Sequence, residues 1–327
     1  MKRKLIIAVV LILALLTCFA GCAPANGPHD DVNTPSAEPA TATPSPTPRP
    51  RRENVAKVIL LLGQSNAVGA SQCTPLKKIL DPDAYSRGSK GYENVRIVYF
   101  AGETTATNYN SKKIDTITSR VLFGKVRFGR SLTGDTFGPE IGIAEAFSNA
   151  YPDDTLYIVK VCRGGTSLSP SFLEGGALFE KAVEMVEGSF SVLEREGYSP
   201  EIISICWMQG ENEALNPTTA SNYKNDLTAL VTLLRNTFDK YAPPGGIPFI
   251  DAGISSYWAC HKTVNALKKE FADGSDLNYY FSTIELGYTY DKEPAGNPDL
   301  AHFDSESEWL LGQKFLEYAM AAYEKVK

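Results

Sequence analysis

The chain has 327 residues, a formal net charge of −6 at neutral pH, and 43% hydrophobic and 10% aromatic residues. This length accommodates one large domain or two small ones, and the hydrophobic content is ordinary for a globular protein. The mild acidity and the absence of a basic stripe argue against nucleic acid as a partner.

The N-terminus has the order of an export signal. A short basic start precedes an unbroken apolar run over residues 5–16, and this pattern predicts a signal peptide over residues 1–21. The segment Phe19-Ala20-Gly21-Cys22 resembles a bacterial lipobox, which predicts that Cys22 is lipidated after cleavage. We therefore expect an extracytoplasmic protein, either a lipoprotein held on the membrane by its anchor or a secreted one; an uncleaved N-terminal anchor is the alternative.

A second composition appears from residue 22 to residue 53. This segment is rich in Pro, Thr, Ala and Ser and has few large apolar residues. Such a composition cannot bury a core and is typical of an extended, semi-rigid spacer. The folded domain is therefore expected over residues 54–327.

Apolar runs and helical periods alternate through the rest of the chain. The runs predict strands at 58–62, 95–100, 156–161, 202–207, 247–254 and 279–284. The periods predict helices near 138–150, 177–196, 218–240, 261–272 and 305–325, with Ser305-x-x-Glu308 as a capping box for the last. This alternation indicates an α/β fold with a mostly parallel sheet, whose active site forms beyond the carboxyl ends of the strands. The irregular segment 101–136 is expected to pass over that site.

Four cysteines fall within the expected domain, and their spacing is not that of a zinc site. Cys162 and Cys206 end strand-like runs, where a small buried hydrophobic side chain is expected. A Cys73–Cys260 disulfide is compatible with an oxidising compartment, and the sequence leaves it open.

The first predicted strand is followed directly by Gly63-Gln64-Ser65-Asn66. A serine on a tight turn at a strand's carboxyl end can present its hydroxyl to a substrate, although a turn hydrogen bond alone would also explain Ser65. A nucleophilic serine needs a base, and histidine is the usual one.

Three histidines are available for that role. His29 lies in the spacer and His261 at the start of a predicted helix, where a capping or surface role is expected. His302 lies in a loop before the last helix, and Asp299 precedes it by three residues. An aspartate at that spacing can orient an imidazole through Nδ1.

Two further polar turns follow predicted strands. After the 156–161 strand come Arg163, Gly164 and Gly165, and paired glycines let backbone N–H groups approach a developing oxyanion. After the 202–207 strand, Gln209 offers a side-chain N–H and Glu211 a carboxylate. Either could be purely structural, with Glu211 paired to an arginine.

Five short sequence blocks, most of them containing the residues discussed above, together resemble the sialate O-acetylesterase and acetyl xylan esterase group of the SGNH hydrolases. The blocks are G-Q-S-N-A-x-G at 63–69, G-P-E at 138–140, R-G-G-T-S-L at 163–168, Q-G-E at 209–211 and D-x-x-H-F at 299–303. The resemblance covers about residues 56–320 and implies a three-layer, flavodoxin-like α/β/α fold, no metal or other cofactor, and hydrolysis of acetyl esters on sugars.

The resemblance also implies roles for individual residues. Ser65 would be the nucleophile and His302 the base. The oxyanion hole would use the N–H groups of Ser65 and of Gly164 or Gly165, together with the Gln209 side chain. Gln64, Asn66 and Arg163 would contact the substrate. Asp299 and Glu211 both remain candidates for the acid that orients His302.

The expected function is therefore removal of acetyl groups from carbohydrate, with xylan favoured over sialic acid only because of the tethered layout. An esterase for other short acyl groups and a tethered glycan-binding protein with an inactive fold are the alternatives. Tyr257, Trp258, Tyr288 and Tyr290 could stack on sugars in either case.

Overall fold

The computed structural model describes residues 53–106 and 108–327. The expected signal over 1–21, the lipidation site Cys22 and the spacer up to residue 52 lie outside the described residues. The following paragraphs concern the described part alone.

The described strands gather into one large sheet and one small pair. Their bounds are β1 Val55–Gly63, β2 Ser71–Gln72, β3 Val95–Ala101, β4 Thr104–Thr105, β5 Gly124–Lys125, β6 Thr136–Phe137, β7 Leu156–Cys162, β8 Ser199–Met208, β9 Phe249–Ala252 and β10 Asn278–Phe281.

The helices include five long ones that follow the predicted periods. The α-helices are α1 Ser65–Val68, α2 Cys73–Ile79, α3 Pro82–Lys90, α4 Ser119–Leu122, α5 Pro139–Ala150, α6 Ala177–Arg195, α7 Pro217–Thr237, α8 His261–Ala272 and α9 Ser305–Val326. Three 3₁₀ turns lie at η1 Ser111–Thr116, η2 Glu213–Leu215 and η3 Asp239–Tyr241.

The large sheet runs in the order β10-β9-β8-β1-β7-β3-β4, with β5 also paired to β3. Neighbours from β10 to β3 are parallel, whereas β4 and β5 pair antiparallel with β3. The central strands β1 and β7 are buried on both faces, which explains their continuous apolar runs. The predicted α/β class with a mostly parallel sheet is confirmed.

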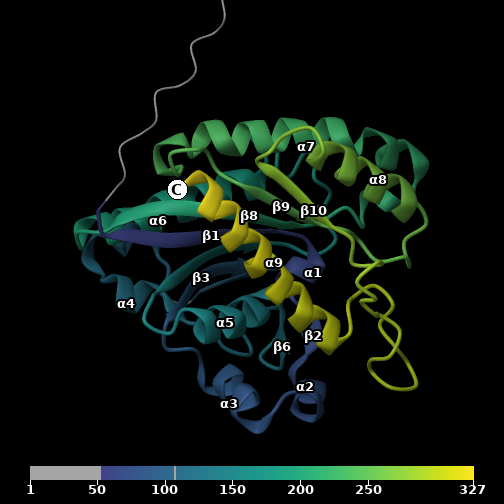
Figure 1. The fold of residues 1–327 in the computed structure, drawn as a ribbon, viewed down its shortest axis with the longest axis horizontal. Coiled ribbons are helices and arrows are strands. Elements are labelled where there is room, and N and C mark those ends of the chain that lie inside the picture. Colours follow the sequence, from purple (N-terminus) through teal and green to yellow (C-terminus); the bar gives the residue numbers. More distant parts are fainter. Residues whose placement is uncertain (1–52, 107) are drawn as a thin grey trace, which may run out of the picture. The chain divides into compact units, whose positions relative to one another are not determined.

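Helices cover both faces of this sheet (Figure 1). On one face, α9 packs on α5 and crosses β8 and β9; on the other, α6 contacts β7 and β8. The α5–α9 crossing is very close, because a Cβ on Gly312 would lie 2.0 Å from the carbonyl oxygen of Pro139. The result is the three-layer α/β/α arrangement.

The order of the parallel strands sets the position of the site. Numbered along the chain, the six parallel strands run 2-3-1-4-5-6, whereas flavodoxin has 2-1-3-4-5. The chain leaves β1 toward the β3 side and leaves β8 toward the β9 side. Loops that diverge in this way open a crevice at the carboxyl ends of β1 and β8.

One local expectation is wrong, and the structure answers the question of the Cys73–Cys260 disulfide that the sequence left open. The capping box does not form, because Ser305 is already the first helical residue and its hydroxyl binds the carbonyl oxygen of Gln72 at 2.8 Å. Cys73 and Cys260 are both free rather than joined. The Cys73 N–H donates to Asp135 O, and that of Cys260 to Ala214 O, so the two thiols are held by different loops.

Cys162 and Cys206 are fully buried, as expected of small hydrophobic side chains. Across 53–106 and 108–327, none of the helices combines the length and the apolar character needed to cross a membrane.

Candidate active site

A pocket of about 370 Å³ opens beyond the carboxyl ends of the central strands. Loops that follow four strands, together with the segment before α9, supply most of its lining, and Leu132 comes from the long excursion between β3 and β7. The lining residues are Gln64, Ser65, Val68, Ala70, Leu132, Gly164, Gly165, Asn212, Leu215, Trp258, Ala301 and His302. Residues far apart in sequence thus meet at the edge where an α/β active site is expected.

A tight turn presents Ser65 at the base of this pocket. Gly63 has φ of +148°, and a Cβ there would lie 2.0 Å from the carbonyl oxygen of Met208, so only glycine fits. The Gln64 N–H donates to that same oxygen at 3.0 Å, which fixes the turn against β8. Ser65 then begins α1 with its own N–H not bonded to any described residue.

His302 faces the same pocket from the loop before α9. The ring Nδ1 of His302 lies 2.6 Å from Asp299 Oδ2, and the backbone N–H of His302 donates to the carbonyl oxygen of Asp299 at 3.2 Å. Since Nδ1 is engaged, Nε2 is the ring nitrogen available to a reacting group. No hydrogen bond joins Ser65 Oγ to His302 in the described chain; such contacts are often long before substrate binds.

Asn66 links the Ser65 turn to the His302 loop. Its Nδ2 donates to Glu211 Oε1 at 2.7 Å, and its Oδ1 accepts the Phe303 N–H at 3.1 Å. Asn66 is buried and does not line the pocket. Its contacts are therefore those of a residue that positions the loop, not of one that touches substrate.

Glu211, the second candidate acid, is completely buried behind Asn66. Burial raises the pKa of its carboxyl above the ordinary value, although the Asn66 hydrogen bond opposes this shift. Within the described residues, Glu211 forms no hydrogen bond or ion pair with an arginine or with His302. Of the two acids, the structure brings only Asp299 to the imidazole.

Gln209 lies beneath the pocket rather than in it. The side chain is fully buried, and Nε2 donates to Gln64 Oε1 at 3.2 Å and to Thr166 O at 3.1 Å, with Glu213 as a further partner. Both amide hydrogens therefore have internal acceptors. This placement does not support the expected donation by Gln209 to an oxyanion. Instead, Gln209 holds the Gln64 side chain in position.

The turn after β7 lies on the other side of Ser65. A Cβ on Gly164 would lie 3.6 Å from Ser65 Cβ, and Gly165 has φ of +63°. Neither glycine N–H has an acceptor among the described residues. Arg163, expected beside the substrate, instead points to Glu103 at 2.7 Å on the surface and does not line the pocket.

Several residues that line the pocket were not predicted from the sequence. Asn212 follows Glu211 directly, and its Nδ2 donates to Ser167 Oγ at the pocket wall. Its position one residue past the Q-G-E block was the available signal. Leu132 comes from the irregular segment 101–136, where its N–H donates to Gly69 O at 3.3 Å, so that segment does reach the site.

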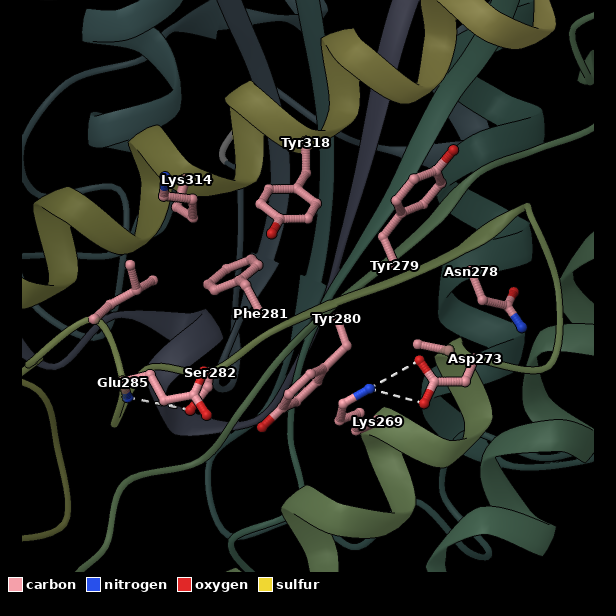
Figure 2. A pocket seen from close by; sticks show the side chains of 12 residues that line it. Lys269, Asp273, Asn278, Tyr279, Tyr280, Phe281, Ser282, Glu285, Lys314 and Tyr318 are labelled. Carbon is pink, nitrogen blue, oxygen red and sulfur yellow. Dashed lines mark hydrogen bonds and ion pairs between the residues drawn. The ribbon is translucent and has the colours of Figure 1, made fainter.

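Another hollow, of about 430 Å³, lies along the edge strand β10 between α8 and α9 (Figure 2). Tyr279, Tyr280 and Tyr318 line it, and Lys269 points to Asp273 at 2.8 Å. Its lining holds no histidine, and its basic Lys269 is already paired. Although Ser282 lines it, this hollow therefore lacks the serine–histidine combination of the first pocket.

The described ranges contain no group of three or more His, Cys, Asp or Glu side chains that could hold a metal ion.

A comparison with protein families shows the family to which the chain belongs. Residues 55–321 match the family described as carbohydrate esterase, sialic acid-specific acetylesterase. The chain belongs to this carbohydrate esterase family. Membership supports an esterase activity for the pocket described above.

Among known proteins, a probable carbohydrate esterase of Arabidopsis thaliana is 30% identical over 121 residues. The match spans 36% of this chain and 42% of the plant protein, so less than half of that relative is covered.

Solved structures share the fold at low identity. The Arabidopsis thaliana protein has a TM-score of 0.56 at 18% identity over 82% of this chain and 98% of its own. NanS has a TM-score of 0.56 at 13% identity, covering 83% and 98%. A carbohydrate acetylesterase from Xanthomonas citri has a TM-score of 0.50 at 12% identity, covering 82% and 57%. These likenesses show that the chain shares its fold with these proteins.

Proposed function

We propose that this protein is a serine esterase that removes O-acetyl groups from carbohydrate through an acetyl-enzyme intermediate. The observation that carries the proposal is the shared pocket: Ser65 and the Asp299-bound His302 line one cavity beyond the strand ends. Family membership supplies the acetylated sugar as the class of substrate.

In the proposed mechanism, Ser65 Oγ attacks the acetyl carbonyl carbon while His302 Nε2 takes the hydroxyl proton. Asp299 stabilises the imidazolium that forms. As the tetrahedral intermediate collapses, the bond to the sugar oxygen breaks and His302 returns its proton to that oxygen. Water, deprotonated by His302, then attacks the acetyl-Ser65 ester and releases acetate.

The oxyanion would be stabilised by backbone donors. The N–H groups of Ser65 and Gly164 lie on adjoining turns and have no acceptor among the described residues. Asn212 lines the same pocket and replaces Gln209 in our proposal as the side-chain donor. Loss of one such donor costs on the order of 10²–10³ in rate.

The decisive experiment measures acetate release from acetylated xylan and from p-nitrophenyl acetate by the full-length protein. We expect Ser65→Ala to lower both rates by on the order of 10⁴-fold or more, because the nucleophile is gone. Ser221→Ala, on the exposed face of α7, is the matched control and should retain full activity.

The outcomes separate the candidates. Ser65-dependent release from both esters supports the enzyme and the xylan-type substrate. Cleavage of the small ester alone keeps the esterase and directs attention to other acyl carriers. Absence of cleavage of either ester by the wild type would contradict the proposal and favour a glycan-binding protein.

A further inference from the structure

Three aromatic side chains gather beside the pocket, and we call them the aromatic ledge. Tyr257 and Trp258 pack edge to face with ring centroids 5.2 Å apart, and Tyr290 lies 6.1 Å from Tyr257. Trp258 also lines the pocket that holds Ser65. The ledge is therefore continuous with the candidate active site. Tyr288 does not take part, because it packs on Phe303.

The ledge is partly open to solvent. Tyr257 is 46% exposed, although tyrosine and tryptophan rings are ordinarily buried further when they serve only as core. Leu215, which lines the same pocket, is 57% exposed. An exposed apolar surface at the mouth of a pocket commonly marks the place where a ligand continues.

Hydrogen bonds hold the ledge in place before any ligand arrives. Asn265 of α8 clamps Ile254 through two bonds of 2.9 Å, one to its N–H and one to its carbonyl. The Cys260 N–H donates to Ala214 O at 2.8 Å, and Ser256 Oγ lies 3.1 Å from Tyr290 OH. Three loops are thereby joined, and a preorganised surface loses little conformational entropy on binding.

The pocket beside the ledge carries no fixed charge. None of its lining residues is Lys, Arg, Asp or Glu. Two cations that could bind an acidic sugar are paired with carboxylates instead: Arg163 with Glu103, and Lys125 with Glu93. A carboxylate moved into such a pocket would lose hydration without gaining a counter-ion, which is costly.

We propose that the aromatic ledge is a sugar-binding subsite, and that it takes an uncharged ring of an oligomeric glycan next to the acetylated ring. The apolar C–H face of the sugar packs on Tyr257 and Trp258, while its hydroxyls stay in water. The substrate is then a neutral acetylated oligosaccharide rather than an acetylated sialic acid. This inference rests on the proposed function only for the acetyl group, not for the binding of the neighbouring ring.

The test compares three substrates with the full-length protein: acetylated xylo-oligosaccharide, O-acetylated sialic acid and p-nitrophenyl acetate. For Tyr257→Ala we expect about a tenfold rise in KM for the oligosaccharide, since loss of about 1.4 kcal/mol of stacking corresponds to tenfold. For p-nitrophenyl acetate, both kcat and kcat/KM should stay unchanged in Tyr257→Ala, because that ester does not reach the ledge. Tyr257→Phe keeps the ring and should behave as wild type.

A matched control is Tyr198→Ala, which removes a tyrosine of similar exposure, 42%, before the amino end of β8. An unchanged oligosaccharide KM in Tyr257→Ala would overturn the subsite. A wild type that prefers the sialic acid ester would overturn the neutral substrate.

Failure of the enzyme itself is distinguishable from failure of the ledge. If the wild type cleaves no ester, the proposed function fails, and titration calorimetry with unacetylated xylohexaose still tests the ledge. Binding by wild type that weakens about tenfold in Tyr257→Ala supports the subsite. Equal binding by both proteins, or no binding by either, contradicts it.

Discussion

Asp299 and Glu211 present the same functional group in opposite surroundings. Asp299 has a side chain that is 54% exposed and bonds His302 Nδ1 at 2.6 Å. Glu211 is fully buried, its pKa is raised by desolvation, and one of its oxygens has no partner among the described residues. An acid that stabilises an imidazolium has to be ionised and in contact with the ring. Of the two acids, only Asp299 contacts the ring.

Substitution of each acid by its amide separates their roles. We expect Asp299→Asn to lower kcat for p-nitrophenyl acetate by about 10²-fold, less than for a fully buried triad aspartate because solvent partly replaces it. Glu211→Gln should change kcat by less than about tenfold, since the amide oxygen can still accept from Asn66. Steady-state rates for both variants decide the matter, and a larger loss in Glu211→Gln would reverse the assignment.

At the scale of elements, the position of His302 depends on how α9 packs against α5. The loop that carries His302 leads directly into α9, and α9 meets α5 through glycines on both helices. A Cβ on Gly142 would lie 1.9 Å from the carbonyl oxygen of Trp309. Because the His302 loop leads into α9, we expect a change in this crossing to shift His302.

Gly312→Ala tests this crossing. Helix propensity alone would favour alanine by about 1 kcal/mol. Overpacking against Pro139 O should outweigh this gain, and we expect the free energy of unfolding to fall by about 3 kcal/mol. Urea unfolding followed by circular dichroism measures the change. Gly134→Ala is the control, because a Cβ there meets no atom within 4 Å; equal stability of the two variants would contradict the close crossing.

At the scale of the whole molecule, several carboxyl groups lie inside the protein. Glu308 is completely buried, and neither of its oxygens has a partner within the described residues. Burial raises its pKa well above the ordinary value, and the neighbouring Glu140 raises it further. Because the folded state holds this proton more tightly than the unfolded state, folding stability is full below the unfolded pKa and declines as pH rises.

Glu308→Gln removes this proton linkage. We expect the stability of the wild type to fall between pH 5 and pH 9 more steeply than that of the variant, because only the wild type must either ionise a buried group or keep its proton. The free energy of unfolding at several pH values measures both slopes. Parallel curves would show that Glu308 is solvated or paired when ionised.

The predicted lipid anchor is the second feature that concerns the whole molecule. We propose that Cys22 carries the lipid that holds the enzyme on the membrane, as the lipobox-like segment before it predicts. In a bacterial host, Cys22→Ser should move the protein from the membrane fraction to the soluble fraction and abolish incorporation of labelled palmitate. Membrane retention of Cys22→Ser without labelling would favour an uncleaved anchor.

The sequence by itself determined the class of the fold and pointed to the candidate catalytic residues. Strands buried on both faces must be continuously apolar, so β1, β7 and β8 were visible as runs, and long amphipathic helices were visible as periods. Ser65 and His302 stood out because a serine nucleophile needs a histidine base, whereas Asp299 and Glu211 both remained candidates for the acid. The short elements α2, α3 and α4 were not foreseen, since few residues and a polar surface leave no period to detect.

Only the tertiary structure decided which of the polar residues face the pocket. Gln209 and Glu211 both follow β8, yet the fold places both in the interior, while Asn212 reaches the cavity. The ledge joins Tyr257 to Tyr290 across 33 positions, and no local pattern records that contact. Orientation at a strand's end depends on hydrogen bonds from distant loops, such as those of Gln64 and Asn66, and these exist only once the chain has folded.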